Sequence, residues 1–275
     1  LISLDLAGLD YDDVTIVSAR SSRDAADRFI RGDADAAMVW VDEKEDCLGE
    51  VPGAFVLEST KDASFLIAES LVVKAEVLRR NGQALRALAE GWLRANAEIN
   101  ANANGARRRA IEIIESFGKS RRIAEEELRT VRLATHGDNI NFFGLNPRYR
   151  GEKGQDLFDY FWTRYAAVMP GVMAKPSWGA IADPALVRGL SLRGRQHQPE
   201  PMHDFAYCQN PEHQRSLSRK SLQVTFPTNG AKLDEAAKRD IEEKFGHLAE
   251  IYFEDCIRLS GNTDSTGRRA YNLEL

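Results

Sequence analysis

Short apolar runs alternate with helical patterns in the first part of the chain, and this alternation constrains the fold more than any other feature. Residues 14–17 are a β-branched run, and residues 36–40 are a second apolar run. Between them, residues 22–30 repeat apolar side chains at helical spacing, with Ser21 and Ser22 as helix caps and Gly32 as the stop. Because strand, helix and strand in this order usually form a parallel sheet covered by helices, the pattern predicts an α/β fold.

Later segments continue the pattern up to residue 190. Residues 55–57, 66–67 and 71–73 are expected as strands. Residues 76–101 are expected as a long helix, because apolar residues recur at three- and four-residue steps: Leu85, Leu88, Trp92, Ala95 and Ile99. Further helices are expected near residues 107–117, 123–134, 155–168 and 184–190.

The pattern breaks after residue 190. Residues 191–218 are rich in proline, glutamine and histidine and have no apolar periodicity, which predicts a linker. Order resumes with a strand at residues 222–226, and Asp234 is placed to cap a helix with one apolar face: Ala237, Ile241, Phe245, Leu248 and Tyr252. We therefore predict one domain over residues 1–190 and a second over residues 219–275.

Composition excludes several classes of protein. The chain has 275 residues, 43% hydrophobic and 29% charged, which is ordinary for a soluble globular protein. A net charge of −5 argues against a nucleic-acid partner. No apolar run reaches the roughly 18–20 residues that span a bilayer. Because the chain starts at Leu1 and stops at Leu275 inside apparent helices, we expect a fragment whose targeting signals are missing.

Cysteine and histidine spacing indicates neither a metal site nor a cofactor. The spacing of His197, His203, Cys208 and His213 matches no common zinc pattern. A Cys47–Cys208 disulfide is compatible with an oxidising compartment, and Cys256 is expected to be buried. The sequence has no nucleophile elbow, phosphate loop or dinucleotide fingerprint, so we predict that the protein is not an enzyme.

A small turn bounded by Gly261 and Gly267 is the most specific motif. The turn, GNTDSTG, places the Asp264 carboxylate and several backbone N–H groups at an expected helix start, a geometry suited to a charged ligand. The plain alternative is an Asx-turn or a helix cap without a ligand.

The C-terminal segment resembles the OmpA-like peptidoglycan-binding family. Four pieces carry the resemblance, in the order 224–227, 231–234, 261–267 and 272–273. It implies an α+β (βαβα) domain in which Asp264 binds the diaminopimelate part of the peptidoglycan stem peptide. The other site residues that it implies are Asn262, Thr263, Gly267 and Asn272. Asn262 replaces the histidine usual before Thr-Asp, and the family's partner arginine would lie beyond Leu275.

Residues 1–190 resemble the later part of a type 2 periplasmic solute-binding protein of the nitrate/sulfonate/taurine (NMT1-like) group. The resemblance rests on residues 7–10, 32–40 and 57–60, and residues 138–144 look like solute-binding proteins fused to OmpA-like domains. It implies a partial two-lobed fold that closes on a small solute by a hinge.

Five residues are the solute-site candidates on this resemblance. Trp40 would supply apolar contact or stacking, Ser59 and Thr60 would donate hydrogen bonds to an oxyanion, and Asp138 and Asn139 would bind a polar group. The plain alternatives are a core tryptophan, a simple turn and a cap of the next element.

Together the two resemblances imply an envelope solute-binding protein of an ABC-type transport system, tethered to peptidoglycan. Its expected partners are the stem peptide, a small anionic solute and an ABC permease. It is expected in the periplasm or cell envelope, with an anchor in a missing N-terminal segment. Two alternatives stay open. One is a wall-linked scaffold or sensor that has lost solute binding, and the other is an enzyme on the same fold, as in pyrimidine-synthesis relatives.

Overall fold

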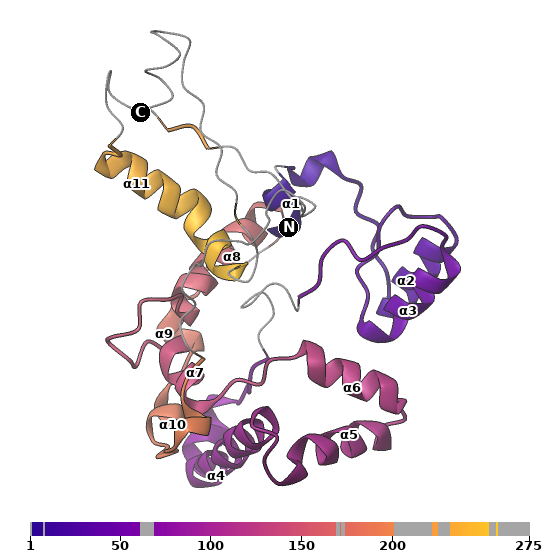
Figure 1. Ribbon diagram of the computed structural model, residues 1–275. Helices are drawn as coiled ribbons and strands as arrows, with labels where there is room; N and C mark the ends of the chain where they lie inside the picture. Colours follow the sequence, from indigo (N-terminus) through magenta and orange to yellow (C-terminus); the bar gives the residue numbers. More distant parts are fainter. Residues whose placement is uncertain are drawn as a thin grey trace.

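The protein is helical throughout the ranges that its computed structural model describes. These are residues 2–7, 9–60, 69–168, 171, 174–200, 222–224, 232–252 and 257. Of these residues, 60% lie in helices and none in a strand (Figure 1). The α-helices are α1 Ile2–Ala7, α2 Ser22–Ile30, α3 Val41–Glu50, α4 Ala75–Asn100, α5 Ala106–Ser116, α6 Arg121–Thr130, α7 His136–Phe142, α8 Gly154–Val168, α9 Trp178–Ile181, α10 Ala185–Arg188, α11 Glu235–Ile241 and α12 His247–Ile251. Short 3-10 turns are η1 Tyr11–Asp13, η2 Ala103–Gly105 and η3 Arg195–His197, and η5 Glu242–Gly246 is a π-helix.

The predicted α/β fold, with its two-lobed sheet and its OmpA-like βαβα domain, is wrong for the described residues. Residues 14–17, 36–40, 55–57 and 71–73 form no strand there, and neither do residues 222–224. Their apolar side chains are largely exposed: Met38 is 89% and Val72 is 88% accessible. The remaining predicted strands, at residues 66–67 and beyond residue 224, fall outside the described residues, apart from Ile257.

The physical reason is that strand propensity is local, whereas a sheet is not. A β-branched run is stabilised as a strand by cross-strand neighbours on the pleated surface. In the described ranges the helices pack against one another instead, and no sheet forms to receive these runs.

The pair α2–α3 forms a helical hairpin near the N-terminus (Figure 1). Ser21 caps α2 as predicted, since its Oγ accepts the Asp24 N–H at 3.1 Å, and the helix ends just before Gly32, whose φ of 78° is left-handed. Ala26 and Cys47 bury the contact between the two helices. The apolar run at residues 36–40 leads directly into α3, with Trp40 as the residue before its first turn. The sequence pattern did not predict this helix.

The long helix α4 lies at the centre of a second group of helices. The predictions of α4, α5 and α6 are confirmed within a few residues. The buried face of α4, however, is not the predicted one: Leu93 and Ala97 are buried, whereas Leu88 and Trp92 are exposed. The helix α4 contacts α5, α10 and η3, and these contacts decide which of its faces is buried. Apolar spacing within α4 could not indicate them.

Residues 191–200, expected as the start of the linker, pack against the preceding helices. Leu190 and Leu192 form a buried cluster with Leu93, and the Thr135 hydroxyl donates to the Gln198 carbonyl at 2.9 Å. Gly137 is needed beside this contact, because a Cβ there would lie 2.2 Å from the Pro199 nitrogen. Residues 201–221 lie outside the described residues, so the domain boundaries stay a prediction.

The C-terminal helices begin where the sequence predicted. Asp234 caps α11, its Oδ1 accepting the Ala237 N–H at 2.7 Å, and the helix continues through η5 and α12 to Ile251. Leu248, Ile251 and Tyr252 pack against Tyr160 of α8, with Phe161 at the edge. Within the described ranges, none of the helices combines the length and the apolar content that a bilayer crossing demands.

We expect Ile251→Ala to lower the free energy of unfolding by about 2–5 kcal/mol, because Ile251 is fully buried and its truncation leaves a cavity between α8 and α12. Urea denaturation followed by far-UV circular dichroism measures this change. The matched control is Ile113→Ala on α5, where the side chain is 59% exposed, so a change of less than about 1 kcal/mol is expected. Equal losses in both variants would contradict the assigned core.

Candidate functional site

The structure places the five predicted solute-site residues on separate elements. Trp40 lies at the start of α3, is 68% exposed and donates its backbone N–H to Ser22 Oγ at 2.8 Å. Ser59 and Thr60 lie outside any helix, at the end of the described range 9–60. Asp138 and Asn139 lie in α7, in a different region from α3 (Figure 1). The described residues therefore do not bring the start of α3 and α7 around one cleft.

The Asp138 carboxylate is occupied by donors from its own chain. Oδ2 accepts the Thr135 backbone N–H at 2.7 Å and lies 2.8 Å from the Thr135 hydroxyl oxygen. Oδ1 accepts Arg132 Nη2 at 2.7 Å and the Glu200 backbone N–H at 2.8 Å. These three N–H donors occupy both oxygens of the carboxylate, and the side chain is only 14% exposed. Asp138 therefore closes a capping box at α7 and ties residue 200 to this helix.

Neighbouring groups extend this network. The Asn139 side-chain amide donates to the Thr135 carbonyl at 2.8 Å, one turn back. Arg132 bridges two carboxylates, because its Nε also lies 2.6 Å from Glu200 Oε2. The geometry thus matches the helix-cap alternative for Asp138 and Asn139, whereas a role in solute binding stays a prediction.

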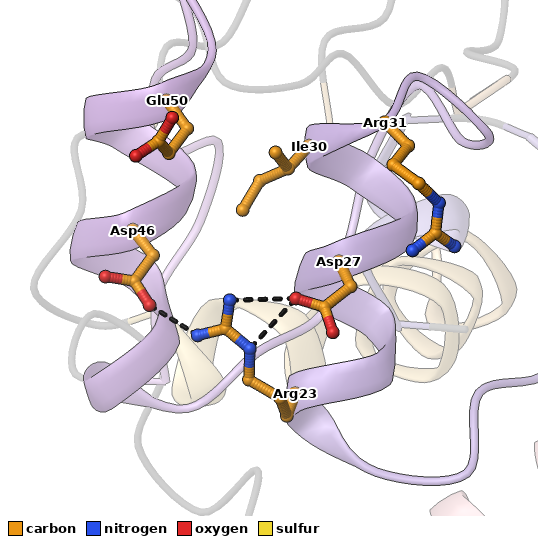
Figure 2. A pocket seen from close by; sticks show the side chains of 6 residues that line it. All are labelled: Arg23, Asp27, Ile30, Arg31, Asp46 and Glu50. Carbon is orange, nitrogen blue, oxygen red and sulfur yellow. Dashed lines mark hydrogen bonds and ion pairs between the residues drawn. The ribbon is translucent and has the colours of Figure 1, made fainter.

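A shallow hollow lies between α2 and α3 (Figure 2). Its volume is about 350 Å³, and it is lined by six residues: Arg23, Asp27, Ile30, Arg31, Asp46 and Glu50. Figure 2 shows the Arg23 guanidinium between the two helices, 2.8 Å from Asp27 Oδ1 and 2.5 Å from Asp46 Oδ2. Arg31 instead pairs with Asp33, at 2.9 Å.

The electrostatics of this hollow disfavour an anion. Hydrogen bonds to Asp46 and then to Asp27 raise the pKa of the Arg23 guanidinium above its ordinary value, so it stays charged and committed to those carboxylates. Figure 2 shows Asp27 and Asp46 on either side of Arg23, and the lining as a whole has three carboxylates and two guanidinium groups. Because none of the predicted solute-site residues lines it, the hollow does not correspond to the expected oxyanion site.

Exposed ion pairs join this hairpin to α6. Lys44 lies 3.4 Å from Glu126, and Lys119 lies 2.9 Å from Asp42 and also contacts Glu127. Such pairs contribute roughly 0–1 kcal/mol each, so they orient α3 on α6 more than they stabilise it. The arginine clusters at residues 107–109 and 121–122 include further pairs with acidic residues on the same helix face, which agrees with a solvated surface.

Sequence reasoning missed a histidine–carboxylate pair where α12 meets α8. His247 Nδ1 lies 2.8 Å from Glu152 Oε1, and burial raises the pKa of the Glu152 carboxyl above its usual range. One sequence feature could have pointed to this pair: His247 directly precedes Leu248, which lies on the apolar face of the C-terminal helix.

The predicted peptidoglycan-site residues, Asn262, Thr263, Asp264, Gly267 and Asn272, lie outside the described residues, as do His203, Cys208, His213 and Cys256. The Cys47–Cys208 disulfide therefore stays a prediction, although Cys47 itself is buried and burial raises the pKa of its thiol.

His197 is buried in η3, and no partner for its Nδ1 lies within the described ranges. Burial lowers the pKa of its imidazole, and the nearby charges of Arg94 and His136 add to this effect. Among the described side chains, no three histidine, cysteine or acidic groups are arranged to hold a metal ion.

Comparison of the chain with protein-family models, with characterised proteins and with solved structures found no match.

We expect Asp138→Asn to lower the free energy of unfolding by about 1–3 kcal/mol, because the amide keeps the shape but loses the ion pair with Arg132 and one acceptor for the buried donors. Urea denaturation at neutral pH measures it. The control is Asp35→Asn, at an exposed carboxylate, with an expected change within about 0.5 kcal/mol. An unchanged stability of Asp138→Asn would contradict the structural role of this carboxylate.

Proposed function

We propose that this chain is a cell-envelope protein that binds peptidoglycan through its C-terminal segment and a small anionic solute through residues 1–190. The observation that carries the proposal is the order of four sequence pieces, ending in the GNTDSTG turn at residues 261–267. A turn of this type at a helix start presents one carboxylate and several backbone N–H groups to a charged ligand.

One structural feature supports the C-terminal half of the proposal. The second piece, residues 231–234, ends in Asp234, and a helix starts directly after it with Asp234 as its cap. This helix buries Leu248 and Tyr252 of the predicted inner face. The segment that precedes the turn therefore has the helix that the motif requires at this place.

In this mechanism Asp264 accepts charge-assisted hydrogen bonds from the ammonium group of diaminopimelate. Asn262, Thr263, Gly267 and Asn272 would shape the turn and supply neutral hydrogen bonds. A hydrogen bond to a charged group contributes about 1.5–3 kcal/mol, which is roughly a tenfold to hundredfold change in affinity. The interaction is non-covalent and needs no cofactor.

The first part of the chain would act as the solute receptor of an ABC-type transport system in the periplasm. Attachment to the wall would hold the receptor near the membrane and raise its local concentration at a permease. Trp40, Ser59 and Thr60 remain the residues proposed for solute contact, because each has a side chain suited to stacking or to an oxyanion.

We expect Asp264→Ala to weaken binding to purified peptidoglycan by about tenfold to a hundredfold, because it removes the charged acceptor. Co-sedimentation of the chain with diaminopimelate-containing peptidoglycan measures this. Glu243→Ala is the control, since Glu243 is an exposed carboxylate on the preceding helix and its loss should leave binding unchanged. Equal retention of Asp264→Ala and wild type in the pellet would refute the wall-binding role.

A wall-linked scaffold or sensor without solute binding is the second candidate, and one observation favours it. The Asp138 carboxylate is engaged by Thr135, Arg132 and the Glu200 amide, and it lies on a helix apart from the start of α3. The described hollow is lined by carboxylates and does not suit an anion.

A thermal-shift panel of nitrate, sulfate, phosphate and taurine separates the two candidates. A receptor at about a hundredfold excess of solute over its Kd gains about 2.7 kcal/mol, which predicts a rise in Tm of roughly 5–10 °C. Sodium chloride at matched ionic strength is the control. No rise with any of the four anions, together with intact peptidoglycan binding, would favour the scaffold.

A further inference from the structure

The contact between α12 and α8 joins parts of the chain that are distant in sequence. Leu248, Ile251 and Tyr252 form one buried cluster with Tyr160 of α8. The Tyr252 hydroxyl also donates a hydrogen bond to Glu58 Oε1. The C-terminal helix is thus held against the first part of the chain by an apolar centre.

A histidine–carboxylate pair lies at the edge of this cluster. Glu152 Oε1 and His247 Nδ1 are 2.8 Å apart, and the two side chains are 13% and 29% exposed. The imidazole lies against the Tyr160 ring, with 4.7 Å between ring centroids. The Arg164 guanidinium carbon lies 3.8 Å from the centroid of the same Tyr160 ring. The imidazole is therefore fixed between the cluster and a carboxylate that is largely removed from water.

Other charged groups around the pair are mostly acidic. The groups that face it are Glu250 on α12, Asp156 and Arg164 on α8, Tyr149 before α8, and Glu58 at Tyr252, with Asp138 and Arg132 acting on Tyr149. Glu250 and Asp156 both repel the charge on Glu152, whereas His247 is the partner that favours it. An ionised Glu152 is therefore a largely buried charge among other carboxylates, with His247 as its favourable partner.

We propose that Glu152 and His247 form a protonation-controlled latch that holds the C-terminal helix against α8 more tightly at mildly acidic pH than at alkaline pH. When the Glu152 carboxyl is protonated, its contact with His247 is a neutral hydrogen bond at the edge of the apolar cluster. When the carboxyl is ionised, a largely buried charge lies beside Asp156 and Glu250 with His247 as the partner that favours it, and the docked state is weakened.

The raised pKa of Glu152 sets the direction of this effect. Burial raises its pKa in the docked state, and Asp156 and Glu250 raise it further, against the opposing effect of His247. A carboxyl group with a raised pKa in the docked state stabilises that state fully below its ordinary pKa, and this stabilisation is lost as pH rises through the raised value. The Glu152 carboxyl therefore favours docking as the pH falls.

The latch controls how the C-terminal segment is presented. When it is closed, α12 stays docked on α8 up to Tyr252. When it opens, the docking of α12 on α8 is weakened. The inference depends on the contact alone and holds whether or not the segment binds peptidoglycan.

Hydrogen–deuterium exchange of the full chain tests the latch. Peptides that cover α8 and α12 are followed at about pH 5 and about pH 8, and each rate is divided by the intrinsic rate at that pH. We expect corrected exchange to be several-fold faster at the higher pH in both peptides. Glu152→Gln keeps the shape and an acceptor but removes the charge, so protection should be equal at the two pH values.

His247→Gln provides the second variant. It removes the partner that favours the ionised carboxylate, so the pH difference should persist. The control is Glu235→Gln on α11, an exposed carboxylate paired with Lys238, which should also keep the pH difference of the wild type. Circular dichroism verifies that each variant is folded. Absence of a pH difference in the wild type, its survival in Glu152→Gln, or its loss in His247→Gln would overturn the proposal.

Discussion

Burial of one apolar helix face against another holds the described part of this protein together. Two small clusters take part in this burial: Tyr160 with Leu248, Ile251 and Tyr252, and Leu93 with Leu190 and Leu192. Each cluster joins segments that are far apart in sequence, so each fixes the path of a long stretch of chain. Because hydrophobic burial is non-directional, these clusters set proximity, and polar contacts set orientation.

The polar contacts lie at the margins of the buried clusters. Asp138 fixes α7 and residue 200 through the Thr135 amide, Arg132 and the Glu200 amide, and Glu152 meets His247 beside the Tyr160 cluster. Both carboxylates are largely removed from water, so loss of a hydrogen-bond partner would be costly at either. By contrast, the ion pairs between α3 and α6 are exposed and contribute little to stability.

Much of the helical structure could be predicted because helix signals are local. Ser21 and Asp234 were identified as caps from the sequence, and both accept the expected backbone N–H. The glycine stop after α2 followed from the same reasoning. The inner face of α4 was predicted less well, because Trp92 and Leu88 follow the apolar spacing while Leu93 and Ala97 meet the neighbouring helices. A stripe of apolar residues shows that a face is suited to burial, but not which neighbours cover it.

The sequence by itself determined where α2, α4 and α11 begin and where α2 and α4 end, since caps, glycine stops and side-chain spacing act within a few residues. It also indicated the Asp264 turn as the segment suited to a charged ligand. Only the tertiary structure decided the fate of the apolar runs at residues 14–17, 36–40, 55–57 and 71–73, because a strand requires a partner from elsewhere in the chain. It likewise brought Glu152 to His247, a contact between residues 95 positions apart that no local pattern encodes.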